Sequence, residues 1–238
     1  MLVEGLKRLV NDVEPYMGVL RIGEEVRLAV ELTDIESESA TLVVGDTMRV
    51  LDVIAEPDAR VFMTSDSFRG VLNGDKDFGA LIGRTRMSES RPIDFEVIST
   101  ELAGETMELL KGLMTHFFLP GKVKSKRLSG ELAGEAHGAH PIPLVYWDGL
   151  RVAWYKVDAG EVLNEKGERD PYPQLLINLS GRGRLLLDEG EVNLEENRAY
   201  YIPPDGLHQV RAEETVKLIW IAWSTPHNKP RTERSYHQ

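Results

Sequence analysis

The sequence predicts two consecutive folded parts: an α+β domain with a mixed sheet and helices on one face, followed by an all-β barrel. Residues 1–120 mix strand-length apolar stretches with helical repeats, whereas residues 144–225 hold short strand-like segments separated by turn dipeptides. Between them, residues 121–143 are rich in Gly, Lys, Ala and Pro and lack a sustained period, which predicts a linker or arm. Residues 226–238 are predicted to form an irregular tail.

Composition narrows the class of protein. Of the 238 residues, 42% are apolar, enough for packed cores, and there is no cysteine, which excludes disulfides and thiolate chemistry. The net charge of −11 opposes binding to nucleic acid. The sequence lacks a run of about 18 apolar residues, so no membrane span is expected. Acidic residues near the start argue against a secretory signal, and a cytoplasmic location is expected.

In the first domain, apolar residues at helical spacing predict an opening helix over residues 2–17, with Pro15 marking its last turn. Gly45-Asp46 predicts a hairpin turn, and Thr64 or Ser65 can cap a helix that stops at Asn73-Gly74. The predicted strands are 26–32, 40–44, 48–54, 59–63, 84–87 and 93–98, and the other predicted helices are 64–73, 78–82 and 101–118. The one basic cluster is predicted to be solvated linker and consists of Lys122, Lys124, Lys126 and Arg127.

Residues 57–64, 68–74 and 78–83 resemble the sterol-carrier-protein type 2 family in their spacing of apolar residues and glycines. The resemblance covers about residues 20–118. It implies a small mixed sheet whose helices enclose an apolar tunnel for lipid-like ligands. In that fold the tunnel or core residues would be Phe62, Phe68, Leu72, Phe78, Leu81, Leu110 and Phe117, of which Phe68 and Phe78 are the candidates for ligand contact. The alternative is that these side chains form an ordinary core and that the domain is a structural or dimerising appendage.

The second domain is predicted to be an antiparallel sandwich or barrel. Its predicted strands are 144–147, 151–157, 174–179, 183–187, 191–194, 199–202, 208–212 and 215–223. Turn dipeptides separate most of them, at residues 148–149, 159–160, 180–181, 189–190 and 205–206.

This block resembles the cupin superfamily in residues 174–183 (QLLINLSGRG) and 201–208 (YIPPDGLH). Cupins hold a divalent metal with three His and one Glu inside the barrel, and His208 matches the last of these ligands. The sequence departs from the first motif: Gln174 stands at the Glu position, and the two His positions fall on Gly167 and Arg169 or on Glu168 and Asp170. The set Glu168, Asp170, Gln174 and His208 would be oxygen-rich and better suited to Mg²⁺ or Mn²⁺ than to Zn²⁺ or Fe.

Residues 179–183 and 201–204 also look like the metal-free barrels of arabinose-type regulators. Nothing after Trp223 can form a helix-turn-helix pair, so the resemblance implies binding of a small ligand and not gene regulation. If Gln174 faces inward, alternation places Leu176 and Asn178 inward as well. The candidate lining residues are therefore Gln174, Asn178 and His208, with aromatic candidates Trp154, Tyr172, Tyr200 and Trp223.

Three hypotheses follow. The favoured one is a non-catalytic protein that binds a lipid-like or small polar ligand without a cofactor, because the metal motif is degraded and no other catalytic set is visible. The alternative is a metal-dependent cupin enzyme of isomerase or oxygenase type that uses His208 and the acids at 168–170. A third is a homodimer that forms through exposed strands. His137 and His140, spaced i, i+3, are either metal ligands or surface histidines.

Overall fold

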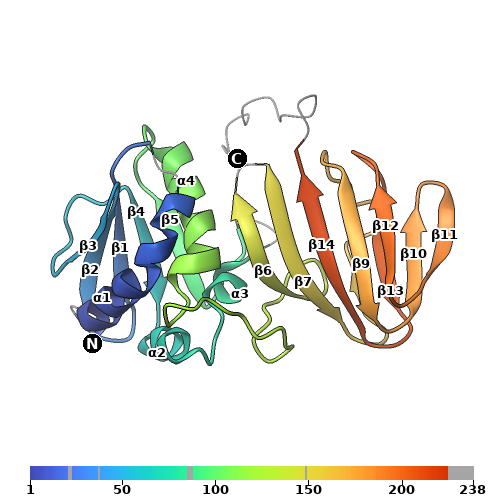
Figure 1. The fold of residues 1–238 in the computed structure, drawn as a ribbon, viewed down its shortest axis with the longest axis horizontal. Helices are drawn as coiled ribbons and strands as arrows, with labels where there is room; N and C mark the ends of the chain where they lie inside the picture. Colours follow the sequence, from blue (N-terminus) through green and yellow to red (C-terminus); the bar gives the residue numbers. More distant parts are fainter. Residues whose placement is uncertain (21–22, 37, 85–87, 148, 225–238) are drawn as a thin grey trace. The chain divides into compact units, whose positions relative to one another are not determined.

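The computed structural model describes residues 1–20, 23–36, 38–84, 88–147 and 149–224. The chain forms two compact units, Met1–Leu132 and Ala133–Gln238, and their boundary falls inside the segment 121–143. In Figure 1, where the colours follow the sequence, the first unit runs from blue to green and the second from yellow-green to red. Among the described residues, no helix is long and apolar enough to cross a membrane.

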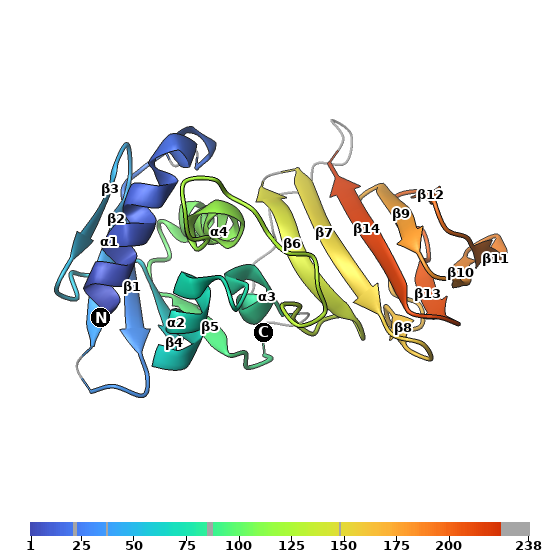
Figure 2. The same cartoon turned by 60° about the horizontal axis from the view of Figure 1, so that its bottom comes forward.

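The first unit is built on a mixed five-stranded sheet of order β3-β2-β1-β4-β5 (Figures 1 and 2). Its strands are β1 (Val26–Leu32), β2 (Ser39–Val44), β3 (Met48–Leu51), β4 (Ala59–Met63) and β5 (Ile93–Val97). Its helices are α1 (Leu2–Val13), α2 (Ser65–Asn73), α3 (Phe78–Ile82) and α4 (Ala103–Gly112), with a 3₁₀ turn at Glu14–Val19 and a π-helical turn at Leu113–Phe117. The pairs β1–β2, β2–β3 and β4–β5 are antiparallel and β1–β4 is parallel, so the sheet is mixed, as predicted.

Local signals explain where the helices of this unit begin and end. Thr64 accepts a hydrogen bond from the Ser67 backbone N–H and caps α2, which ends at Gly74 with a φ of 78°. The opening helix is α-helical only to Val13, because Pro15 removes a backbone donor and the chain continues as a 3₁₀ turn. The strand predicted over 84–87 falls largely on residues 85–87, which lie outside the described part of the chain.

Apolar side chains of α1, the sheet, α2, α3 and α4 form one hydrophobic core. Phe68 is 0% exposed and Phe78 is 1% exposed, and the Phe78 ring stacks on Phe118 with centroids 3.8 Å apart. A Cβ atom built on Gly5 would lie 2.8 Å from the Phe68 ring, so the α1 backbone packs directly against that ring. Both phenylalanines are thus buried and closely packed.

The prediction of a solvated basic linker was wrong for one residue, Lys126. Its side chain is 8% exposed, and its Nζ lies 2.9 Å from a carboxylate oxygen of Asp77, which is also buried. Lys126 Nζ donates to the Met114 carbonyl as well, and Asp77 caps α3 by accepting from Ala80 N. Burial lowers the pKa of Lys126, and the nearby Asp77 carboxylate opposes this effect. The segment after Pro120 is therefore bound to the first unit by a buried ion pair.

The second unit is all β among the residues described, in two sheets of order β12-β9-β14-β7-β6 and β11-β10-β13-β8. Its strands are β6 (His140–Trp147), β7 (Leu150–Val157), β8 (Val162–Leu163), β9 (Gln174–Ser180), β10 (Gly183–Leu187), β11 (Gly190–Leu194), β12 (Arg198–Ile202), β13 (Gln209–Ala212) and β14 (Val216–Trp223). Side chains from both sheets, such as Leu176, Leu218, Leu185 and Val210, share one core. Among the described strands, hydrogen bonds do not join the two sheets, so the predicted barrel is not closed.

Candidate functional site

The candidate site lies in the second unit, on the inward face of the sheet β12-β9-β14-β7-β6. Alternation along β9 buries Gln174, Leu176 and Asn178, of which the two amides are each 0% exposed. The neighbouring strand β14 places Trp220 opposite Leu176, and Trp220 packs against the core shared by the two sheets. A fully buried amide inside an apolar core requires partners for each of its polar atoms.

Gln174 has a partner for only one end of its amide. Its Oε1 accepts a 2.6 Å hydrogen bond from Trp220 Nε1. Because the indole N–H is a donor and never an acceptor, this contact determines which end of the amide faces Trp220. The Gln174 Nε2 group is buried and has no hydrogen-bond partner among the described residues. A buried donor without an acceptor costs about 1–3 kcal/mol, which makes this amide the candidate position for an acceptor group.

Two tyrosines of the same sheet, Tyr155 on β7 and Tyr146 on β6, pack against the shared core. The Tyr155 ring meets the Trp220 ring edge to face, with centroids 6.4 Å apart, and Tyr155 is 6% exposed. Burial raises the pKa of Tyr155 well above its usual value, and the nearby Tyr146 and Glu168 raise it further. Burial also raises the pKa of Tyr146. Both hydroxyls are therefore neutral at physiological pH and can donate or accept a hydrogen bond.

The loop between β8 and β9 brings Glu168 towards the same region. Glu168 lies beside His137, whose Nδ1 is 2.8 Å from a carboxylate oxygen of Glu168. This contact is the largest cause of the lowered pKa of Glu168, and His208 lowers it to a smaller extent. The His208 ring is buried, and its Nδ1 lies 3.0 Å from the Gly206 carbonyl oxygen, so Nδ1 carries the ring proton there. The acceptor nitrogen of neutral His208 is then Nε2.

The carboxylates suggested as metal ligands have other partners in the structure. Glu168 pairs with His137, and Asp170 accepts from the Tyr172 backbone N–H. The described residues contain one group of His, Asp and Glu side chains whose ligand atoms all lie within 4.8 Å of one another, and it comprises His140, Asp158 and Glu161. Glu168, Asp170 and His208 are not such a group.

The aromatic candidates fall in different places. Trp154 lies between Ala153 and Tyr155, which face the core, so its own ring is on the opposite face of the sheet. Trp223 is three positions after the inward Trp220 and is likewise on the opposite face. The Arg151 guanidinium lies over the Tyr172 ring, with its Cζ atom 5.1 Å from the centroid of that ring. Tyr200 packs against the core and donates to the Asn193 carbonyl.

Asn178 is buried on the inward face, but its role differs from that of Gln174. Its Nδ2 donates 2.8 Å to the Gly181 carbonyl, within the turn that ends β9, and its Oδ1 has no partner among the described residues. Four residues of strand separate it from Gln174, roughly 13 Å at the usual rise per residue. A compact molecule does not span both amides, and the Gln174 end is the one that has an aromatic neighbour, Trp220.

The sequence reasoning missed Trp220, Tyr155, Tyr146 and the His137–Glu168 pair. The first could have been found from period-2 alternation along β14, where Val216, Leu218 and Trp220 share a face. The His137–Glu168 contact has no such signal, because it joins two loops that are distant in sequence.

The Glu168–His137 contact predicts an acid-dependent loss of stability. Because the pKa of Glu168 is lowered from 4.5 in the folded protein, its contribution is fully present above about pH 4.5 and is lost as pH falls through the folded value. We expect Glu168→Gln to be less stable than wild type near neutral pH, with the difference shrinking in acid. Urea unfolding followed by tryptophan fluorescence at several pH values measures this. Exposed Glu189→Gln is the control, and a pH-independent difference would contradict the assignment.

Comparison with solved structures finds partial likeness to cupin barrels. A cupin 2 conserved barrel domain protein from Salinispora arenicola is 19% identical, with 43% of this chain and 90% of that chain covered and a TM-score of 0.38. A cupin superfamily protein from Desulfitobacterium hafniense is 16% identical, with 43% and 95% covered and a TM-score of 0.37. A cupin-2 domain from Rhodospirillum rubrum is 17% identical, with 43% and 76% covered and a TM-score of 0.36.

The chain is thus similar, over less than half its length, to cupin barrel domains. At these identities and TM-scores, the likeness carries no information about activity or ligand. No protein-family model and no curated protein matches the chain.

Proposed function

We propose that the second unit is a non-catalytic binding module for a small polar molecule, which binds on the inward face of the sheet β12-β9-β14-β7-β6. The observation that carries this proposal is the buried Gln174 Nε2 group, which has no acceptor while Oε1 is held by Trp220. A ligand oxygen at this position would satisfy the donor and remove its desolvation cost.

The surroundings indicate the chemistry of the ligand. Gln174 Nε2 requires an acceptor such as a carbonyl or carboxylate oxygen. Trp220 supplies aromatic surface beside the Gln174 amide, and the Tyr155 ring extends that surface edge to face. These features favour a compact carbonyl compound with a flat apolar part over a lipid chain.

The test is a pair of substitutions at Gln174, with native mass spectrometry of the full chain as purified. Gln174→Glu keeps an acceptor for Trp220 but replaces the amide N–H₂ with oxygen, and Gln174→Met removes both groups. We expect either change to weaken retention of the co-purifying molecule by roughly 5- to 150-fold, the equivalent of losing about 1–3 kcal/mol.

Gln209→Met is the matched control, because Gln209 is also a buried glutamine but its Nε2 donates to the Asn164 carbonyl. It should leave the bound molecule in place. A wild-type protein that carries no small molecule, or Gln174 variants that retain it fully, would refute the binding proposal.

The alternative proposal is a metal-dependent enzyme of isomerase or oxygenase type centred on His208. One observation favours it: the His208 ring is buried and its Nδ1 faces the Gly206 carbonyl oxygen, which leaves Nε2 as the nitrogen that could bind a cation. Supporting it requires a cation that is lost on His208→Ala, together with turnover by the loaded protein. A cation that survives His208→Ala would count against it.

A further inference from the structure

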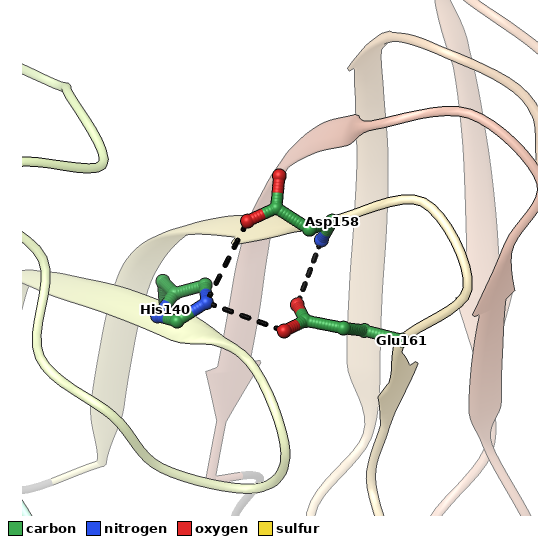
Figure 3. A group of neighbouring side chains, drawn as sticks. All are labelled: His140, Asp158 and Glu161. Atoms are coloured by element: carbon green, nitrogen blue, oxygen red, sulfur yellow. Dashed lines mark hydrogen bonds and ion pairs between the residues drawn. The ribbon is translucent and has the colours of Figure 1, made fainter.

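A second polar group lies in the same unit, outside the Gln174 region and unused by the proposed function. His140, the first residue of β6, faces Asp158 and Glu161, which follow the end of β7 (Figure 3). Its Nε2 lies 3.5 Å from a Glu161 carboxylate oxygen and 3.8 Å from one of Asp158. The three ligand atoms all lie within 4.8 Å of one another.

The backbone orients the two acids before any ligand is considered. Glu161 N donates to the Asp158 carbonyl at 2.9 Å, and Asp158 N donates to Glu161 Oε2 at 2.8 Å, which closes a tight turn. Gly160 allows that turn with a φ of 87°. Two further backbone bonds tie the turn to Ala212 at the end of β13. The carboxylates are therefore positioned by the fold, and not by His140 alone.

The hydrogen bond made by Nδ1 of His140 determines whether Nε2 carries a proton or a lone pair. Nδ1 lies 3.3 Å from the Gly134 carbonyl oxygen, which can only accept, so Nδ1 carries the proton. In a neutral imidazole Nε2 then directs a lone pair at two carboxylates. This pattern, with the second ring nitrogen bound to a carbonyl, is typical of histidines that ligate metals.

The distances also favour a cation over a direct hydrogen bond. Separations of 3.5 and 3.8 Å exceed the usual range of about 2.7–3.2 Å for an N–H···O bond. Two ligand atoms that each lie about 2.1 Å from a shared metal are roughly 3.0–3.5 Å apart, which is close to the observed spacing.

We propose that His140, Asp158 and Glu161 bind a divalent transition-metal cation such as Zn²⁺ or Mn²⁺. One imidazole nitrogen and two carboxylates suit these ions. The side chains are 25%, 38% and 39% exposed, so water completes the coordination. Lys156 Nζ contacts the same Asp158 oxygen and Thr215 donates to the other, so the ammonium group competes with the cation.

The test is calorimetric titration of the full chain with Zn²⁺ and with Mn²⁺, followed by elemental analysis after dialysis. We expect one cation per chain at this group. His140→Ala and Glu161→Gln should each weaken binding by about tenfold or more. Lys156→Met should tighten binding, because it removes the competing positive charge. Circular dichroism and thermal melting check that each variant is folded.

His208→Ala separates this site from the interior one, and it should leave the cation bound. Loss of the cation in His208→Ala with retention in His140→Ala would overturn the proposal. Full binding in both His140→Ala and Glu161→Gln would also overturn it. Absence of binding at millimolar Zn²⁺ would do the same, because the three residues would then be only an ion-pair cluster. Because the readout is metal binding, it is independent of whether Gln174 binds a small molecule.

Discussion

Lys126→Met is expected to destabilise the first unit by about 3–5 kcal/mol, because it leaves the buried Asp77 carboxylate without a counter-ion. All four tryptophans lie in the second unit, and the described α-helices lie in the first. Urea unfolding followed by circular dichroism at the helical band therefore reports the first unit, while tryptophan fluorescence reports the second. The loss should appear in the helical signal.

Lys122→Met is the control, since Lys122 is an exposed lysine of the same segment and should change stability little. In the double variant Asp77→Ser with Lys126→Met, serine can still cap α3 and no buried charge is left unpaired. It should regain most of the lost stability. A loss below about 1 kcal/mol for Lys126→Met would show that the pair behaves as an exposed one.

Phe68→Ala is expected to cost about 3–5 kcal/mol in the same helical signal, because the ring is fully buried and α1 packs directly on it at Gly5. The backbone contact limits how far the surroundings can collapse into the space. This prediction separates the two interpretations of the aromatic residues of the first unit. A core residue loses stability when truncated, whereas a residue lining a ligand tunnel changes what the unit binds.

Phe95→Ala is the matched control, because Phe95 is only partly buried and lies under the Arg84 guanidinium. Its loss should be clearly smaller. The contrary result is a Phe68→Ala variant that is nearly as stable as wild type and loses a lipid-like molecule seen by native mass spectrometry. That result would support Phe68 as a lining residue of a ligand tunnel and would contradict its role as an ordinary core residue.

Many elements could be predicted from sequence because their signals are local. Apolar periodicity and the Thr64 and Gly74 caps defined α2, and alternation bounded β1 and β4 at the residues observed. The two-residue strand β8 was missed, since Val162–Leu163 is too short to show a period. The linker was misjudged at Lys126 because its partner Asp77 lies 49 positions earlier in the chain.

The sequence by itself determined an α+β region followed by a β region, the inward alternation of Gln174 and Asn178, and the absence of cysteine chemistry. Only the tertiary structure decided that the β-sheets do not close, that Trp220 holds one end of the Gln174 amide, and that His140 meets Asp158 and Glu161. The physical reason is range. Periodicity and capping act within a few residues, whereas hydrogen-bond partners and ligand sets join side chains from different strands and loops, whose distances depend on how the sheets pack.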